Sequence, residues 1–246
     1  MIVALATHAG DSHLAGQLLD WLAELGGASQ SSLLLAYDRS LDEHTRKQLR
    51  DRASESFGGV EVLRCDIGSF PPERQNLSRP AANRMFKAVS DYIAEVIQEP
   101  FLWLEPDAVP LKDDWLSRIE YEYETCHKAF MGTVVSLQRA GHVHPYLCGV
   151  SVYPAGARDV LEPFLMWQEP WDTASSRKVI PLAHDTRLIQ HAYHVPGTTF
   201  VIEKPEGSKN NVQQLDFLRP DAVLYHRVKN DSLINLLKRK EPCQAQ

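Results

Sequence analysis

Two acidic residues stand where an apolar segment ends. Phe101 to Leu104 is a run of apolar residues that predicts a buried strand, and Glu105 and Asp107 follow it on either side of Pro106. In open α/β sheets, ligands bind outside the carboxyl ends of the strands. Carboxylate oxygens at such a place suit Mg²⁺ or Mn²⁺, which can also hold substrate phosphates. The plainer interpretation is a turn that carries two solvated acids.

Three later segments could add groups to that pair. Asp185 is predicted to open a helix, where it would serve as an N-cap or as a catalytic carboxylate. Gly149 interrupts a strand-like run, which suggests the close approach of a ligand or of another backbone. His226 ends a predicted strand and Lys229 follows it. These two residues could complete a metal site and neutralise a diphosphate leaving group.

The motifs of several other enzyme classes are absent from the sequence. The segment THAGDSH after the first predicted strand has no GxGxxG pattern, and the chain contains neither GxxxxGK[ST] nor GxSxG. These absences argue against a dehydrogenase, a P-loop enzyme and a serine hydrolase of the nucleophile-elbow type.

The HxH pair and the later histidine cluster raise the alternative of a zinc hydrolase, but ten histidines make such spacings common by chance and no carboxylates stand at matching spacing. The four cysteines include no CxxC pair, so their spacing indicates neither a zinc site nor a disulfide framework. The HxH pair and the later histidine cluster are interpreted as surface or loop residues: His142, His144, His191 and His194.

The elements that must position these residues alternate between strand and helix. Strands are predicted over 2–7, 32–37, 60–65 and 101–104, with amphipathic helices between them. This order predicts an α/β fold, Rossmann-like in its first half, with a mostly parallel sheet covered by helices on both faces. Beyond residue 113 the pattern is mixed. Helices are predicted over 114–127, after Pro154, from Asp185 and over 232–240, and strands near 130–136, 148–153, 198–203 and 222–225.

Length and composition predict one globular domain over residues 1–246. The chain is 43% hydrophobic, which is enough to fill a core. The chain has 32 acidic residues against 26 lysines and arginines, a net charge of −6. This charge argues against a protein whose whole surface binds nucleic acid. With no signal sequence at the start and no long apolar stretch, we expect a soluble, cytoplasmic protein with no membrane partner.

Taken in order, these segments resemble the GT-A glycosyltransferases, and the ending YHRVKNDSL is similar to that of small phage-encoded and bacterial members. The resemblance implies a half that binds a nucleotide-diphosphate sugar, UDP-sugar above all, over 1–112, and an acceptor-binding half over 113–246. It also implies a DxD motif that binds Mn²⁺ or Mg²⁺ together with the diphosphate. Glu105-Pro106-Asp107 is the counterpart, and it departs from DxD in its first acid and in its middle residue.

The resemblance also implies roles for individual residues. Asp107 and His226, with Glu105, would hold the metal ion, and Asp185 would take the proton of the acceptor hydroxyl in an inverting enzyme or orient the acceptor in a retaining one. The nucleotide sugar would contact Thr7, His8, Asp38, Arg79, Asn83, Arg84, Glu105 and Lys229. The acceptor side would include Gly149, Trp167 and Trp171.

Plainer interpretations exist for several of these residues. Asp38 could cap a turn, Arg79 and Arg84 could be solvated, and Trp167 and Trp171 could be half-buried packing residues.

Other classes and acceptors stay open at this point. A sugar-nucleotide nucleotidyltransferase would want a Gly-rich basic loop where THAGDSH stands, and a non-catalytic nucleotide-sugar-binding module would need no counterpart of Asp185. The acceptor could be a hydroxymethylated pyrimidine in phage DNA, or a protein side chain or surface-glycan precursor. Cations for DNA phosphates could come from Arg46, Lys47, Arg50, Arg52, Arg227, Lys229, Lys238, Arg239 and Lys240.

Overall fold

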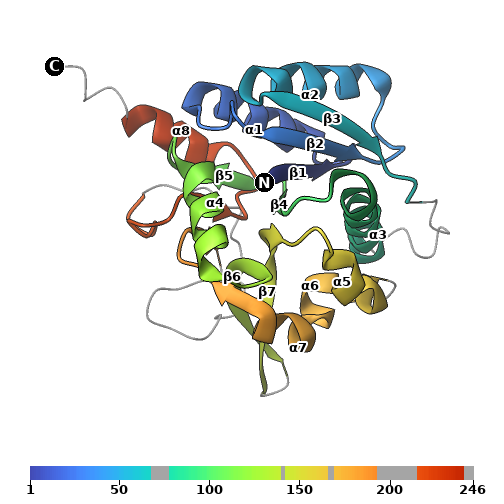
Figure 1. Ribbon diagram of the computed structural model, residues 1–246. Coiled ribbons are helices and arrows are strands. Elements are labelled where there is room, and N and C mark those ends of the chain that lie inside the picture. Colours follow the sequence, from blue (N-terminus) through green and yellow to red (C-terminus); the bar gives the residue numbers. More distant parts are fainter. Residues whose placement is uncertain (68–77, 140–141, 166–168, 193–214, 241–246) are drawn as a thin grey trace.

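The computed structural model describes residues 1–67, 78–139, 142–165, 169–192 and 215–240. Its centre is a seven-stranded sheet with the order β3-β2-β1-β4-β7-β6-β8, and a three-stranded sheet with the order β5-β10-β9 lies beside it (Figure 1). The larger sheet contains strands from both halves of the sequence. Its members are β1 (Ile2–Thr7), β2 (Ser32–Tyr37), β3 (Gly59–Arg64), β4 (Phe101–Leu104), β6 (Phe130–Arg139), β7 (His142–Tyr153) and β8 (Ala183–Asp185).

The first four strands are parallel to one another, and β7 pairs antiparallel with both β4 and β6. The predicted α/β fold with a mostly parallel sheet is therefore confirmed. The smaller sheet consists of β5 (Ala108–Pro110), β9 (Ile189–His191) and β10 (Leu224–His226).

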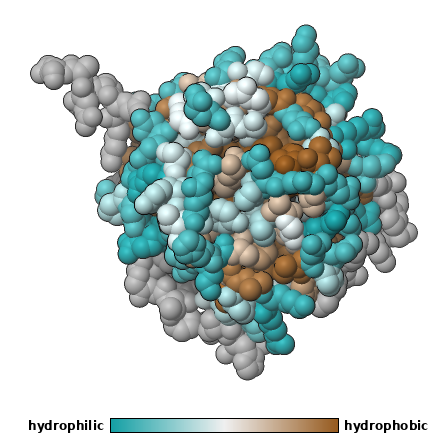
Figure 2. Space-filling view, viewed as in Figure 1, coloured by the Kyte–Doolittle hydropathy of each residue, from teal (hydrophilic) through white to brown (hydrophobic). Residues whose placement is uncertain are grey.

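Helices cover both faces of the large sheet because its central strands are apolar on both sides. Val3 and Leu5 pack in one cluster with α1, α2 and α4, whereas Ile2 and Ala4 pack in another cluster with α3 and α5. The helices are α1 (Ser12–Leu25), α2 (Glu43–Ser56), α3 (Ser78–Tyr92), α4 (Trp115–Cys126), α5 (Ala157–Leu165), α6 (Trp171–Ala174), α7 (Ser176–Val179) and α8 (Ser232–Lys240). On the face seen in Figure 2, hydrophilic residues form much of the rim, including the region of α2. Among the described residues, no helix is long and apolar enough to cross a lipid bilayer.

Two expectations for the segment after residue 182 are wrong. Asp185 does not open a helix; it ends β8, and the next residues lead into β9. The segment is too short for a stable helix, and its pairing with β6 and β10 satisfies its backbone instead. His191, interpreted as a surface or loop histidine, is 2% exposed in β9. His194 and the strand expected near 198–203 lie outside the described residues.

Two glycines at the end of α1 give a test of the packing between α1 and the segment before α4. Gly26 and Gly27 have φ angles of 79° and 86°, in the left-handed region. A Cβ on Gly27 would lie 1.6 Å from the Asp113 carbonyl oxygen, whereas a Cβ on Gly26 would meet no atom within 4 Å.

We expect Gly26→Ala to lower the free energy of unfolding by about 1–2 kcal/mol, the cost of the left-handed backbone alone. Gly27→Ala should lower it by about 4 kcal/mol or more, because the backbone near Asp113 must also move. Urea denaturation of both variants measures the difference. Equal losses in the two variants would show that the contact with Asp113 does not constrain the fold.

Candidate functional site

The acidic turn lies where the two sheets meet. β4 ends at Leu104 and β5 begins at Ala108, and the Ala108 amide donates to the Glu105 carbonyl at 2.9 Å. The antiparallel register of β5 and β10 pairs Ala108 with His226. The backbone amides of Arg227 and Val228 both donate to the Asp107 carbonyl, at 3.0 and 2.9 Å. Backbone pairing therefore brings the acids of the turn to the histidine near the end of the chain.

Arg227 adopts an uncommon backbone conformation at this junction. Its φ is 94°, a value that non-glycine residues rarely adopt and that costs on the order of 1–3 kcal/mol. The hydrogen bonds from the amides of Arg227 and Val228 to the Asp107 carbonyl hold Arg227 in this conformation.

The side chains of the turn and of β10 form a compact charged cluster. His226 Nε2 lies 3.1 Å from Glu105 Oε2 and 3.2 Å from Asp107 Oδ1. Lys229 Nζ forms an ion pair with Asp107 Oδ2. Asp107 is 3% exposed and His226 is 6% exposed. A buried carboxylate at this place needs such partners, because an unpaired buried charge is costly.

The pKa values of Asp107 and His226 are shifted strongly. Burial acts to raise the pKa of Asp107, but His226 and Lys229 outweigh it and hold that pKa well below its usual range. Burial acts to lower the pKa of His226, but Cys148, Asp107 and Glu105 outweigh it and raise that pKa well above its usual value. The imidazolium of His226 and the ammonium of Lys229 together thus offset the charges of the two acids.

The same three side chains are suited to a divalent cation. One ligand atom each of Glu105, Asp107 and His226 lies within 4.8 Å of the others. Asp107 is close enough to His226 and Lys229 for ion pairing, yet within the described part of the chain neither of its buried carboxylate oxygens accepts a hydrogen bond. Two carboxylates and one imidazole form a donor set that fits Mn²⁺ or Mg²⁺, and a cation would take the place of the imidazolium proton.

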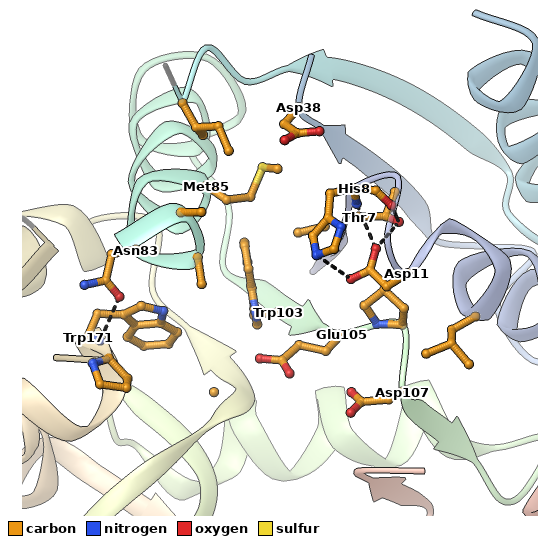
Figure 3. Close-up of a pocket in the computed structure, with 18 of the residues that line it drawn as sticks. Thr7, His8, Asp11, Asp38, Asn83, Met85, Trp103, Glu105, Asp107 and Trp171 are labelled. Carbon is orange, nitrogen blue, oxygen red and sulfur yellow. Dashed lines mark hydrogen bonds and ion pairs between the residues drawn. The ribbon is translucent and has the colours of Figure 1, made fainter. Parts of the chain in front are cut away.

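Glu105, Asp107 and Lys229 of this cluster line a pocket of about 560 Å³. Figure 3 shows Glu105 and Asp107 at one end of this pocket, Asp38 at the opposite end and Trp103 between them. Of the residues predicted for the site, the pocket brings together Thr7, His8, Asp38, Asn83, Glu105, Asp107, Gly149, Trp171 and Lys229.

The first strand contributes an ordered turn to the pocket. Thr7 Oγ1 and the His8 amide both donate to Asp11 Oδ1, each at 2.8 Å (Figure 3). Asp11, which sequence reasoning did not select, therefore shapes this wall. Asp38 accepts from the Ser40 amide at 3.0 Å, so it caps its turn, as the plainer interpretation held, and it also lines the pocket.

Asn83 and Trp171 make the opposite wall rigid. Asn83 donates to the Glu169 carbonyl at 2.8 Å and accepts from the Trp171 amide at 3.0 Å, which ties α3 to the start of α6. Trp171 is 6% exposed and its ring stacks on Phe86 with a centroid separation of 3.9 Å. Trp171 is thus chiefly a packing residue that also lines the pocket.

Gly149 and Asp172 complete the floor near Glu105. A Cβ on Gly149 would lie 2.9 Å from Glu105 Oε1, so the close approach predicted for this glycine is to the Glu105 side chain. Asp172 was missed in the sequence although it directly follows Trp171. It lines the pocket and accepts from the Thr173 amide at 2.7 Å. Burial, reinforced by Glu105, raises the pKa of Asp172 to about 6.

Other predicted site residues lie elsewhere. Asp185 is exposed at the end of β8 and its Oδ1 accepts from the Val134 amide at 2.9 Å. Arg84 donates to the Ile67 carbonyl at 2.8 Å. Neither residue lines the pocket as far as the described residues define it. Trp167 and the side chain of Arg79 are outside the described part of the structure.

A second group of side chains adjoins His226 on its other edge. Cys148 Sγ lies 3.3 Å from His226 Nδ1, and His191 packs against the His226 ring. The sequence did not indicate this group, because its members come from β7, β9 and β10 and only the fold brings those strands together.

Comparison with known proteins identifies the fold. No protein family and no curated protein matches the chain in sequence. Solved structures do match it: galactosyltransferase LgtC in complex with donor and acceptor sugar analogues is similar, with a TM-score of 0.55 and 8% identity over 92% of this chain and 86% of that chain. Mouse xyloside xylosyltransferase 1 is also similar, with a TM-score of 0.50 and 9% identity over 92% of this chain and 96% of that chain.

The bifunctional glycosyltransferase WbbM gives a TM-score of 0.53 and 11% identity over 92% of this chain, which spans 45% of the length of that protein. The chain therefore has the GT-A glycosyltransferase fold.

Proposed function

We propose that the protein is a metal-dependent glycosyltransferase that moves a hexose from a UDP-hexose to an acceptor hydroxyl. The observation that carries the proposal is the group of Glu105, Asp107 and His226, of which the two acids line the wall of the pocket. A volume of about 560 Å³ is in the range that encloses a small-molecule ligand. The GT-A fold, which the chain shares with solved glycosyltransferases, supports the same reaction class. The pocket also lies outside the carboxyl ends of the parallel strands, where open α/β sheets bind their ligands.

The two ends of the pocket would bind different parts of the donor. At one end Asp38 and the Thr7–His8 turn would contact the nucleoside. At the other end Glu105, Asp107 and His226 would hold Mn²⁺ or Mg²⁺. When bound, such an ion supplies Lewis-acid stabilisation of a diphosphate leaving group. Lys229, whose side chain is 59% exposed beside Asp107, would add a positive charge near the phosphates.

Asp172 is the residue that we propose takes the acceptor proton. It lines the pocket close to Glu105, and a carboxylate whose pKa is about 6 suits proton transfer near neutral pH. The acceptor hydroxyl would attack the anomeric carbon while its proton moves to an oxygen of Asp172 and the sugar–phosphate bond breaks. The resemblance to GT-A enzymes instead implies Asp185, whose role stays a prediction.

The acceptor of the proposal is a hydroxymethylated pyrimidine in DNA, which the phage-like ending of the sequence suggests. A protein or glycan hydroxyl is the competing acceptor, and ion pairs on the surface favour it. Arg52 pairs with Asp20 at 3.0 Å and Lys238 pairs with Glu24 at 2.5 Å, which reduces the charge that these cations offer to phosphates.

Replacement of Asp107 tests the metal site and the reaction together. We expect Asp107→Asn to lower Mn²⁺ affinity and hexose release from UDP-hexose by about 100-fold or more, because a ligand charge is lost at a buried position. Electron paramagnetic resonance measures bound Mn²⁺, and product analysis with and without chelator measures turnover. Asp51→Asn, on exposed α2, is the matched control and should behave as wild type. Full turnover in chelator would refute metal dependence, and binding of UDP-hexose without any turnover would indicate a binding module.

Replacement of the two candidate bases separates their roles. Asp172→Asn should lower kcat by about 10²–10⁴-fold with donor affinity retained, because a general base acts only in the chemical step. Asp185→Asn should leave kcat close to wild type, because Asp185 caps the Val134 amide outside the pocket. The opposite pattern would assign the base to Asp185.

The stability of the Asp172 variant provides an independent check of its burial. Since the pKa of Asp172 is raised to about 6 from the unfolded value near 4, the folded state loses stability as pH rises from about 4 to about 6. Asp172→Asn should remove this loss, which amounts to roughly 3 kcal/mol for two pKa units. Urea denaturation at pH 4 and pH 7 measures it, and an unchanged pH dependence would contradict the burial of the charge.

The acceptor is tested by mass spectrometry. We expect a hexose on nucleosides from hydroxymethylated duplexes, and none on those from ordinary duplexes, after incubation with UDP-hexose and Mn²⁺ at low salt, where DNA binding is strongest. If donor is consumed and no nucleoside gains a hexose, DNA is removed as the acceptor, and transfer to protein or glycan hydroxyls in the same assay would identify the competing class.

A further inference from the structure

Cys148, His191 and His226 form a buried cluster next to the carboxylate site. Cys148 lies in β7, His191 in β9 and His226 in β10. One ligand atom from each lies within 4.8 Å of the others. Cys148 and His191 are each 2% exposed, and the rings of His191 and His226 are 5.0 Å apart at an angle of 71°.

The donor atoms of this cluster differ in kind from those of the carboxylate site. One thiolate and two imidazoles are the ligand types of zinc sites, whereas the carboxylates of Glu105 and Asp107 suit harder ions. We propose that Cys148, His191 and His226 bind a thiophilic divalent ion, with Zn²⁺ as the probe, at a site that shares His226 with the Mn²⁺ or Mg²⁺ site.

Sharing of His226 makes the two sites mutually exclusive. Its Nδ1 lies 3.3 Å from Cys148 Sγ, while its Nε2 lies 3.1 Å from Glu105 Oε2. A neutral imidazole has one nitrogen that can bind a metal and one that carries the proton. Zn²⁺ at Nδ1 therefore leaves a proton on Nε2, which donates to a carboxylate and cannot bind a second ion. The Cys148 thiol gives up its proton to solvent when the ion binds.

The consequence is inhibition by soft ions through a site whose three residues do not line the pocket as the described residues define it. Zn²⁺ would withdraw His226 from the Mn²⁺ site while Glu105 and Asp107 stay in place. The binding part of this inference is independent of the proposed reaction, whereas the competition part rests on the hard-ion site of that proposal.

Co²⁺ titration of the purified protein tests the site by its spectrum. Thiolate ligation gives a strong charge-transfer absorption in the near ultraviolet, which carboxylate and imidazole ligands do not give. We expect this band in the wild type and in Cys126→Ser, the control that removes a thiol from α4, and not in Cys148→Ser. His191→Gln, a second variant of the cluster, should weaken Co²⁺ binding, and Asp107→Asn should keep the band although it loses Mn²⁺.

Mn²⁺ binding measured by electron paramagnetic resonance completes the test. Zn²⁺ should raise the apparent Kd for Mn²⁺ at least tenfold in the wild type and less than twofold in Cys148→Ser, each compared with the Kd of the same protein without Zn²⁺. Absence of the band from the wild type, its persistence in Cys148→Ser, or unchanged Co²⁺ affinity in His191→Gln would overturn the site. If the wild type shows the band but no transfer activity, the proposed function is refuted and the proposal for this site is not.

Discussion

The pairing of β5 with β10 is the constraint on which the site depends. It joins the turn after β4 to a strand near the end of the described chain, and two amides after His226 converge on the Asp107 carbonyl. Without this pairing, Asp107 would be a buried carboxylate beside apolar strands, which costs several kcal/mol unless a partner is present. With it, His226 and Lys229 supply the compensating charge. The charged end of the pocket and the contact between His226 and Cys148 both depend on this one junction.

Much of the fold could be predicted because its signals are local. The apolar runs of β1, β2 and β4 and the helical spacing in α1 are visible without any tertiary information, and they determine the parallel half of the sheet. The acidic turn was also predictable, since a strand that ends in acids is a local pattern. That His226 could join these acids in a metal site was a possibility raised by its place at the end of a predicted strand, and the resemblance to GT-A enzymes made it specific.

The sequence could not reveal what long-range pairing decides. β8 and β9 are three residues each, too short for periodicity to distinguish strand from helix, so Asp185 was placed at a helix start and His191 on the surface. Cys148, His191 and His226 are far apart in the chain, and no spacing rule joins them. Asp172 was overlooked because its signal is burial and the proximity of Glu105, and neither is a property of the local sequence.

The short length of β10 has a consequence for how this protein can vary. Side chains of a strand alternate between its two faces, so a shift of one residue in the register with β5 would turn Tyr225 toward the acids and His226 away from them. Many single substitutions around the pocket would alter one contact each. A single inserted or deleted residue between Leu224 and Val228 would instead move the histidine, the two converging amides and Lys229 at once. Chain length in this segment is therefore under tighter constraint than residue identity at most of the pocket wall.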